Sequence, residues 1–244
     1  MHSKRKVIAI PPAFNEENRI GQVVKKISKD VVDVICVVDD GSTDRTAAVA
    51  KEAGADIVIS HKQRRGLGSA IRTGIDYAIS NHFEIIVILA GNDKDNPAEI
   101  PLLLDPIVKE DYDYVQGSRY LEGGRYGQMP LHRVIGTRLY PILLNIATLG
   151  KSKASDATNG FRAYKTSLFQ DKRLNIWQDW LDGTELEFYL HYQVVKYGYK
   201  IKEVPVSKLY LQVKKYKEYT KVKPIVDWWK ILKPLVCLTL KIKS

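Results

Sequence analysis

Short apolar runs alternate with longer amphipathic stretches from residue 6 to residue 117. This alternation is typical of βα units, in which parallel strands form a sheet and the helices between them cover its faces. The apolar runs predict strands at 6–10, 34–38, 56–60, 84–90 and 114–117. The amphipathic stretches predict helices at 17–28, 43–53, 66–81 and 98–109. The pattern therefore predicts an α/β protein with a mostly parallel sheet, whose chemistry lies in the loops that follow the strands.

The second half of the chain has a less regular pattern. A glycine-rich loop at 121–128 precedes an expected helix at 132–149, and another helix at 184–197 precedes a last strand at 200–206. No internal repeat and no linker rich in proline, glycine or serine divides the chain. We therefore expect a single domain over residues 1–223, followed by an amphipathic C-terminal segment over residues 224–244.

This C-terminal segment is apolar, but charged residues and a proline interrupt it before it reaches the length of a membrane span. Trp228 and Trp229 lie near lysines, a combination that suits the headgroup region of a bilayer. The alternative is a helix that packs on its own domain or on a second subunit. Both interpretations are consistent with the sequence, and the second allows a homo-oligomer.

The formal net charge of +10 changes the expected partners. It suits an anionic lipid surface, a phosphorylated substrate or nucleic acid, but the sequence has no nucleic-acid-binding motif, so we expect no nucleic-acid partner. Two distant cysteines favour a reducing compartment, and the apolar run near the N-terminus is too short for a signal peptide. We expect a cytoplasmic protein that binds peripherally to the cytoplasmic face of a membrane.

Two loops after predicted strands carry polar residues that local structure explains only in part. PPAFNEEN follows the first strand, where Asn15 could cap a helix. VVDDGSTDRT follows the second strand, and capping by Ser42 or Thr43 would leave Asp39 and Asp40 unexplained. Adjacent carboxylates repel each other unless something binds them, which predicts a ligand such as a base or a ribose.

Together with four later segments, these loops resemble a known enzyme family. The later segments are RRGLGSAIRTGIDYA (64–78), GSRY (117–120), SDATNGFRAY (155–164) and IKEVPV (201–206). In this order, over about residues 6–207, the segments resemble the inverting glycosyltransferases of family 2 type with the GT-A fold. The most similar branch contains dolichyl-phosphate mannose synthase and the polyprenyl-phosphate hexose synthases. The resemblance implies a nucleotide-binding sheet with a C-terminal, acceptor-side extension.

The resemblance also implies roles for individual residues on the donor side. Asp40 would bind the base or ribose, with Asp39 in support, and Arg119 would balance phosphate charge. Glycines at 66 and 68 would let a helix start approach the nucleotide. The residues implied to bind the nucleotide sugar are Pro12, Phe14, Glu16, Asp39, Asp40, Gly66 and Gly68.

The loop after the fourth strand departs from the family. The family usually has a DxD motif here that holds a metal ion, whereas ungapped alignment places Ala90 and Asn92 at the acidic positions. Asp93 and Asp95 follow, so either the loop brings one of them to Mg²⁺ or Mn²⁺, or metal binding is weakened or lost. We expect a metal, with Asp93 as the main ligand and Asp95 as a second ligand or a helix cap.

On the acceptor side, the resemblance implies binding by a polar loop and by several cations. The implied acceptor-binding residues are Arg133, Asn159, Arg162, Lys215 and Lys221, with Thr220 in the closing loop. Asp156 and the helical pair Glu185 and Glu187 are candidate bases, and at most one of the pair can face the site.

The function that these patterns favour is transfer of a hexose from a nucleotide diphosphate sugar to a polyprenyl phosphate, with inversion. The expected catalytic residues are Asp93, Arg119 and Asp156. One alternative is transfer to a sugar hydroxyl of a lipid-linked or surface glycan, which would need Asp156 or Glu185 as base. Another is a non-catalytic protein that binds nucleotide sugars.

Overall fold

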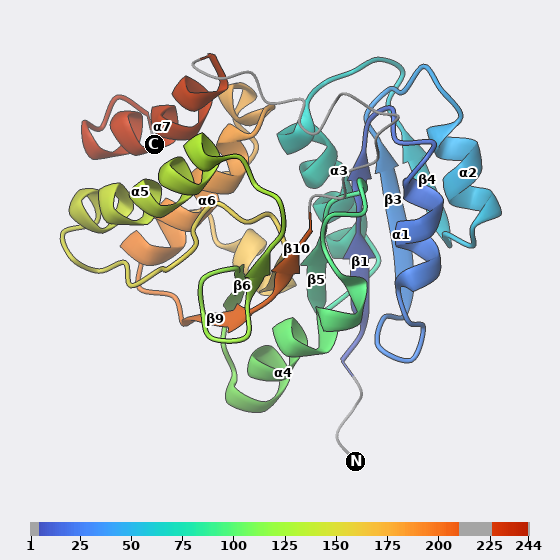
Figure 1. Cartoon of the computed structure of the whole chain (residues 1–244), viewed down its shortest axis with the longest axis horizontal. Coiled ribbons are helices and arrows are strands. Elements are labelled where there is room, and N and C mark those ends of the chain that lie inside the picture. Colours follow the sequence, from blue (N-terminus) through green and yellow to red (C-terminus); the bar gives the residue numbers. More distant parts are fainter. Residues whose placement is uncertain (1–4, 210–225, 244) are drawn as a thin grey trace.

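The computed structural model describes residues 5–209 and 226–243, and its central feature is a twisted, mostly parallel sheet (Figure 1). The strands pair in the order β4-β3-β1-β5-β8-β6-β9, and the short strand β2 also pairs with β3. Their bounds are β1 Val7–Ile10, β2 Pro12–Ala13, β3 Val34–Asp39, β4 Ile57–Ser60, β5 Ile85–Ile88, β6 Tyr114–Ser118, β8 Arg162–Lys165 and β9 Ile201–Pro205. The predicted α/β class and the predicted strands are confirmed.

The sequence pattern missed β8, which lies in the middle of the sheet and is antiparallel to both β5 and β6. This strand contains Arg162 and Tyr164, both fully buried, in place of an apolar run. From the sequence, these residues were therefore predicted to form part of a polar loop. A buried arginine needs hydrogen-bond partners, and only the tertiary structure shows that β8 has them.

Helices cover both faces of the sheet. The bounds are α1 Ile20–Lys26, α2 Thr46–Glu52, α3 Leu67–Ser80, α4 Ile100–Glu110, α5 Leu131–Ala147, α6 Glu185–Lys196 and α7 Val226–Thr239. Side chains alternate along each strand, so Ile8 and Ile10 pack toward α3 and α6, whereas Val7 and Ala9 pack toward α1 and α4. This double burial explains the uninterrupted apolar runs of the first half.

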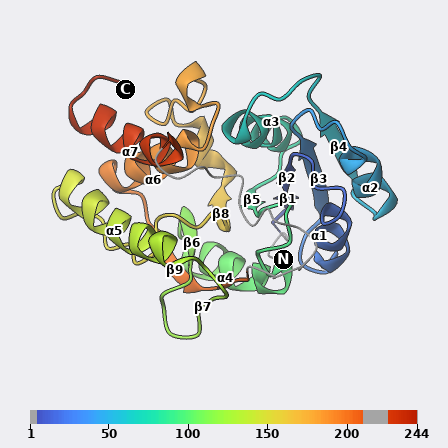
Figure 2. The same ribbon diagram turned by 45° about the horizontal axis from the view of Figure 1, so that its top comes forward.

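The helices α5, α6 and α7 gather at the end of the molecule opposite α1 and α2 (Figures 1 and 2). α7 packs against α5 and α6 through Leu238, which is buried, and through Leu235. The C-terminal segment thus packs on its own domain, while Trp229 remains exposed on its other side. None of the helices in the described ranges combines the length and apolarity needed to cross a bilayer.

A two-stranded ribbon connects the glycine-rich loop with the chain that follows β9. β7 (Arg125–Tyr126), from the glycine-rich loop, pairs with β10 (Ser207–Lys208), which follows β9. Lys208 also forms an isolated bridge with Asp95 of the loop after β5. The chain beyond β9 therefore lies against the loop in which the family motif is altered.

Candidate active site

The loops after β1 and β3 bind each other. The backbone N–H of Asn15 donates to Ser42 Oγ at 2.9 Å, and Asn15 Oδ1 accepts from the Thr43 N–H at 2.9 Å. Asn15 has a positive φ of 50°, and α1 begins only at Ile20. The capping interpretation of Asn15 is therefore wrong: its side chain holds the second loop instead of a helix end.

Asp39 and Asp40 are both buried, and backbone N–H groups stabilise their charges. Asp39 Oδ1 accepts from the Ser42 N–H at 3.1 Å. The two oxygens of Asp40 accept from the Arg65 and Gly66 N–H groups, each at 2.8 Å, and Oδ1 lies 2.9 Å from His61 Nδ1. Asp40 thus anchors the loop at 61–66, a structural role that the sequence did not predict, and its nucleotide-binding role stays a prediction.

Phe14 offers an aromatic surface at the same edge of the sheet. It is half-buried, and the guanidinium of Arg64 lies 4.3 Å from the centre of its ring. Pro12 and Glu16 are buried beside it, and Glu16 pairs with Arg19 at 3.0 Å. The implied donor residues of the first loop therefore lie together, next to an arginine suited to stacking or phosphate binding.

Gly66 and Gly68 do leave space for a close neighbour, but the neighbour is protein. A Cβ on Gly66 would lie 2.4 Å from the carbonyl oxygen of Asp182, and one on Gly68 would lie 2.0 Å from that of Leu181. The Ser69 N–H donates to the Asp182 carbonyl at 3.0 Å. The absence of a Cβ at these glycines is therefore required by the backbone at 181–183, and their contact with the nucleotide stays a prediction.

The structure separates the two aspartates of the altered loop. Both oxygens of Asp93 accept from Lys26 Nζ, at 2.7 and 2.8 Å. Asp95 is buried, accepts from the Ala90 N–H at 2.8 Å and pairs with Lys208 at 2.5 Å. In residues 5–209 and 226–243, no three His, Cys, Asp or Glu side chains are grouped so as to hold a metal ion. The expected Asp93 and Asp95 metal site is therefore not preformed.

Lys94 lies between these aspartates, and the sequence analysis overlooked it. Burial first, and then the positive charges of Lys208 and Arg133, lower the pKa of Lys94 to about 8, against the attraction of Glu16. A half-buried ammonium among other cations gains stability when an anion binds. Its position inside the displaced DxD pattern was the signal available in the sequence. Lys208, directly after a strand, was a second one.

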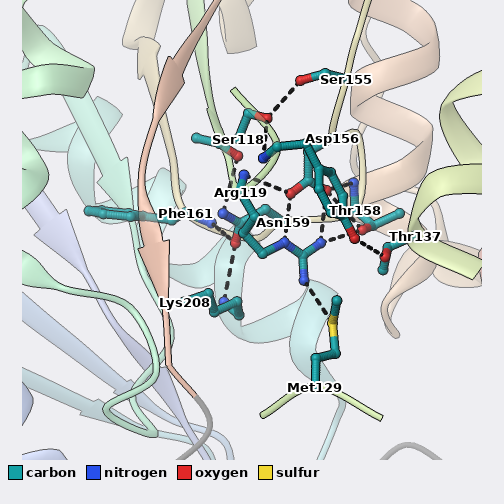
Figure 3. A network of polar contacts seen from close by, with 12 residues as sticks. Ser118, Arg119, Met129, Thr137, Ser155, Asp156, Thr158, Asn159, Phe161 and Lys208 are labelled. Carbon is teal, nitrogen blue, oxygen red and sulfur yellow. Dashed lines mark hydrogen bonds and ion pairs between the residues drawn. The ribbon is translucent and has the colours of Figure 1, made fainter. Parts of the chain in front are cut away.

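Arg119 and Asp156 form a buried ion pair (Figure 3). Arg119 Nε donates to Asp156 Oδ2 at 2.6 Å and Nη2 donates to Oδ1 at 2.8 Å, while Nη2 also donates to Thr158 at 2.7 Å. Burial raises the pKa of Asp156, but the hydrogen bonds and positive charge of Arg119 lower it by more. The pKa therefore lies below its usual range. A lowered pKa makes the carboxylate a weak base, and both of its oxygens already accept hydrogen bonds from Arg119, so the role of Asp156 as base stays a prediction that this geometry does not favour.

The same pair fixes the position of Arg119. Its side chain is almost completely buried and directs a bidentate fork to Asp156, and the expected role of Arg119 in balancing phosphate charge stays a prediction. Glu203, which the sequence analysis missed, accepts from the N–H groups of Ser155 and Asp156 at 2.7 and 2.9 Å. These residues position the loop at 155–159.

Arg162 and Asn159 are equally buried, and they differ in what they contact. Arg162 donates to the carbonyls of Asn159, Ala157 and Glu187, which ties β8 to α6, and its contact with the acceptor phosphate stays a prediction. Asn159 Oδ1 instead accepts from Lys208 Nζ at 3.2 Å (Figure 3). Asn159 therefore contacts the cationic part of the site, which consists of Lys94, Lys208 and Arg133.

The remaining acceptor candidates divide between two regions. Arg133, in the first turn of α5, is half-buried and close enough to Lys94 to affect its pKa. Lys215, Thr220 and Lys221 lie outside the described residues. Their implied roles stay predictions.

Glu185 is the better placed of the two helical candidate bases. It lies in the first turn of α6, and its Oε2 is buried without a hydrogen-bond partner among the described residues. Asn92 Oδ1 is likewise buried and has no hydrogen-bond partner among the described residues. Buried acceptors of this kind are suited to hydroxyl groups of a ligand.

Comparisons with known proteins identify the family of this chain. The family described as Glycosyl transferase family 2 matches residues 8–172. An uncharacterized protein of Methanocaldococcus jannaschii is 32% identical over 86% of this chain and 84% of its own length. A dolichyl-phosphate hexose transferase of Haloferax volcanii is 30% identical over 79% of this chain and 78% of its own length.

A solved structure shares the fold. Glucosyl-3-phosphoglycerate synthase from Mycobacterium tuberculosis, in complex with Mn²⁺, uridine diphosphate and phosphoglyceric acid, matches with a TM-score of 0.66 at 21% identity. The match covers 97% of this chain and 77% of that one. With its GT-A fold and its match over most of its length, the chain belongs to glycosyl transferase family 2 and is a nucleotide-sugar-dependent glycosyltransferase.

Proposed function

We propose that the chain transfers a hexose from a nucleotide diphosphate sugar to a polyprenyl phosphate, with inversion at the anomeric carbon. The name of the Haloferax volcanii relative supports this acceptor class. So does the cationic part of the site, where Arg133, Lys94 and Lys208 lie close enough to interact electrostatically. An acceptor of this class needs cations for its phosphate and an apolar surface for its chain.

An exposed apolar stripe on α5 and its C-terminal turn is the observation that carries this proposal. Its residues follow each other at three- and four-residue spacing and lie on one face of the helix. The stripe consists of Leu131, Ile135, Leu139, Ile142, Ile146 and Leu149, all exposed, with Leu149 89% exposed. At 100° per residue, Arg133 lies on the opposite side of α5, which is turned toward Lys94.

The same surface suits attachment to a membrane from the cytoplasmic side. Trp229, Leu240 and Ile242 are also exposed, and they belong to α7 and the turn after it, which packs beside α5. With a net charge of +10, the chain would be attracted to anionic lipids while these apolar groups enter the headgroup region. The acceptor would then reach the site along the surface in which it is dissolved.

The transfer needs orientation more than proton removal. An oxygen of the acceptor phosphate, already ionised near neutral pH, attacks the anomeric carbon as the bond to the diphosphate breaks. The bonding electron pair leaves with the diphosphate oxygen, and attack from the opposite face inverts the carbon. Because the acceptor oxygen is already ionised, no base is needed to remove a proton. Arg133 would hold the acceptor phosphate in position for the attack.

One observation favours a second acceptor class. A sugar hydroxyl has a high pKa and needs a base, and Glu185 has a buried carboxylate oxygen that makes no hydrogen bond with any described residue. Transfer to a glycan hydroxyl would then use Glu185. In that case Glu185→Gln should abolish transfer, whereas transfer to a phosphate should tolerate it.

A donor and acceptor screen tests the proposal. Purified full-length protein is incubated with radiolabelled UDP- and GDP-hexoses and anionic vesicles with or without polyprenyl phosphate. We expect organic-extractable label only when polyprenyl phosphate is present, and NMR of the product should show inverted anomeric configuration. Label transferred to a soluble glycan and not to lipid would contradict the proposed acceptor.

A further inference from the structure

We propose that Arg138 binds the phosphate of an anionic phospholipid at the margin of the α5 stripe, and that the ring of Tyr120 positions its guanidinium for this contact. The inference rests on the membrane attachment proposed above and adds the group that recognises the charge of the bilayer. It concerns the lipids that form the bilayer, whereas Arg133 is proposed for the acceptor phosphate.

Arg138 lies beside the exposed apolar stripe of α5. It follows Ile135 by three residues and precedes Ile142 by four, and residues at these spacings are neighbours on a helix surface. Ile135 is 55% exposed and Ile142 is 57% exposed, and Arg138 is exposed as well. When the stripe enters a bilayer, the long side chain of Arg138 can therefore reach the level of the lipid phosphates.

The ring of Tyr120 holds the guanidinium at this margin. The centre of the ring lies 4.5 Å from the guanidinium carbon of Arg138. In the part of the chain that the structure describes, no carboxylate forms an ion pair with Arg138. Stacking occupies a face of the guanidinium and not its edge. The N–H donors in its plane therefore remain available to a phosphate, whose oxygens match their fork.

Tyr120 is itself fixed by three contacts. Thr137 Oγ1 donates its hydrogen to backbone carbonyls one turn earlier in α5, so the Tyr120 hydroxyl donates to Thr137 Oγ1, at 2.5 Å. The Tyr120 N–H donates to Ser118 Oγ at 3.1 Å. The ring packs edge-on against Tyr126, with 5.3 Å between the ring centres. The ring cannot turn away without losing these contacts, and it therefore preorganises Arg138.

The face that carries Arg138 is cationic as well as apolar. Residues 131–154, which include α5, contain four arginines and lysines and no carboxylate. Residues 226–243, which form α7 and the turn after it, contain four lysines and one aspartate. α7 packs beside α5 and exposes Trp229. An anionic lipid surface complements both properties of this face.

The contact would also connect the bilayer with the acceptor side of the site. Tyr120 directly follows Arg119, whose guanidinium carbon lies 5.7 Å from the centre of the Tyr120 ring. A lipid phosphate at Arg138 would therefore hold the loop after β6 at the membrane surface. The site would then face an acceptor that is dissolved in the same bilayer.

Partition of the purified full-length chain into vesicles tests the inference. The vesicles contain phosphatidylcholine alone or with added phosphatidylglycerol, and no polyprenyl phosphate. Arg138→Gln should weaken partition into the anionic vesicles by at least about tenfold, against about fivefold for the loss of one surface charge. Arg138→Lys keeps the charge but loses the fork, so it should weaken partition by at least about threefold. In vesicles without phosphatidylglycerol, both variants should stay within about twofold of wild type.

The matched control is Arg45→Gln, which removes an exposed arginine beside α2, at the opposite end of the molecule (Figure 1). It should weaken partition by less than about twofold, because salt screens a charge so far from the membrane. Tyr120→Leu removes the ring and should behave like Arg138→Lys, whereas Tyr120→Phe keeps the ring and should stay within about twofold of wild type. Combined with Arg138→Gln, Tyr120→Leu should cause no further loss, because its effect acts through Arg138. Melting temperatures verify that each variant is folded.

Equal partition of wild type and folded Arg138→Gln into anionic vesicles would overturn the inference. So would a difference between them that appears only when polyprenyl phosphate replaces phosphatidylglycerol, because Arg138 would then bind the acceptor. A wild-type protein that binds neither kind of vesicle would instead contradict the membrane attachment on which the inference rests, so the two failures can be told apart.

Discussion

Arg119 and Asp156 meet in a buried bidentate ion pair, with Nε–Oδ2 and Nη2–Oδ1 distances of 2.6 and 2.8 Å. The pair joins the end of β6 to the loop at 155–159, which carries Asn159 toward Lys208. The pair thus supports a neighbouring charged group, and the chemistry that the sequence suggested for both residues stays a prediction.

Asp156→Asn should therefore reduce stability strongly. Removing one partner of a buried pair leaves an uncompensated charge, which typically costs about 3–5 kcal/mol. Urea unfolding gives the measurement, and Asp105→Asn is the control, because the exposed Asp105–Lys109 pair should contribute less than about 1 kcal/mol. Equal destabilisation by the two variants would contradict the structural role of the buried pair.

The same pair predicts a pH dependence of stability. The pKa of Asp156 is lowered in the folded state, so its contribution is present above its unfolded pKa of about 3.9 and is lost as the pH falls through the folded value. The free energy of unfolding should thus fall below about pH 4 more steeply for wild type than for Asp156→Asn. Parallel curves for the two proteins would show that Asp156 is not the group responsible.

Asp40→Asn should affect both binding and stability. Its carboxylate holds the 61–66 loop through two backbone hydrogen bonds, so we expect a loss of about 1–3 kcal/mol and at least about tenfold weaker nucleotide binding. Asp39→Asn loses at most one such bond and should weaken binding with a smaller loss of stability. Calorimetry measures the affinity and urea unfolding measures the stability. Unchanged affinity in both variants would contradict the prediction that Asp39 and Asp40 bind the nucleotide.

Gly68→Ala should destabilise the protein, because the added Cβ would lie 2.0 Å from the Leu181 carbonyl and 2.5 Å from that of Gly183. The matched control is Gly136→Ala in α5, where the nearest atoms belong to Trp228 at 3.4 and 3.5 Å. Alanine favours helices over glycine by about 1 kcal/mol, so the control should be neutral or slightly stabilising. Melting temperatures provide the comparison, and a neutral Gly68→Ala would show that the 181–183 segment can move away.

Asp93→Asn should change turnover by less than about threefold if the only role of Asp93 is its ion pair with Lys26. A metal ligand would behave differently: its loss should cut turnover at least about tenfold and weaken Mn²⁺ binding in the nucleotide complex. Steady-state kinetics in EDTA and in Mn²⁺ distinguishes the two results. The second result would restore the original expectation for Asp93.

Ile142→Asp, in the α5 stripe, should abolish flotation with anionic liposomes, because a charge in the centre of the apolar surface opposes insertion. Val108→Asp, at an exposed position on α4, is the control and should float like wild type. Binding should weaken with added salt, which screens the attraction between the basic chain and anionic lipid. Flotation of Ile142→Asp at wild-type levels would show that the α5 stripe does not contact the membrane.

The sequence by itself determined the fold class and which polar loops lie together at one edge of the sheet. Uninterrupted apolar runs such as the one at 34–38 require burial on both faces, and polar loops after such strands meet at one edge of a parallel sheet. These rules act over short stretches of chain, so Phe14, Glu16, Asp39 and Asp40 could be placed together without the structure.

Only the tertiary structure decided which charged residues pair with each other. Arg119 and Asp156 are separated by 37 positions, and Asp95 and Lys208 by 113, so no local pattern links them. Burial of Arg162 in β8 depends on carbonyls from the loop before it and from α6. A charge becomes structural or available to a ligand according to the partners that folding brings to it, and in these pairs the partners lie far apart along the chain.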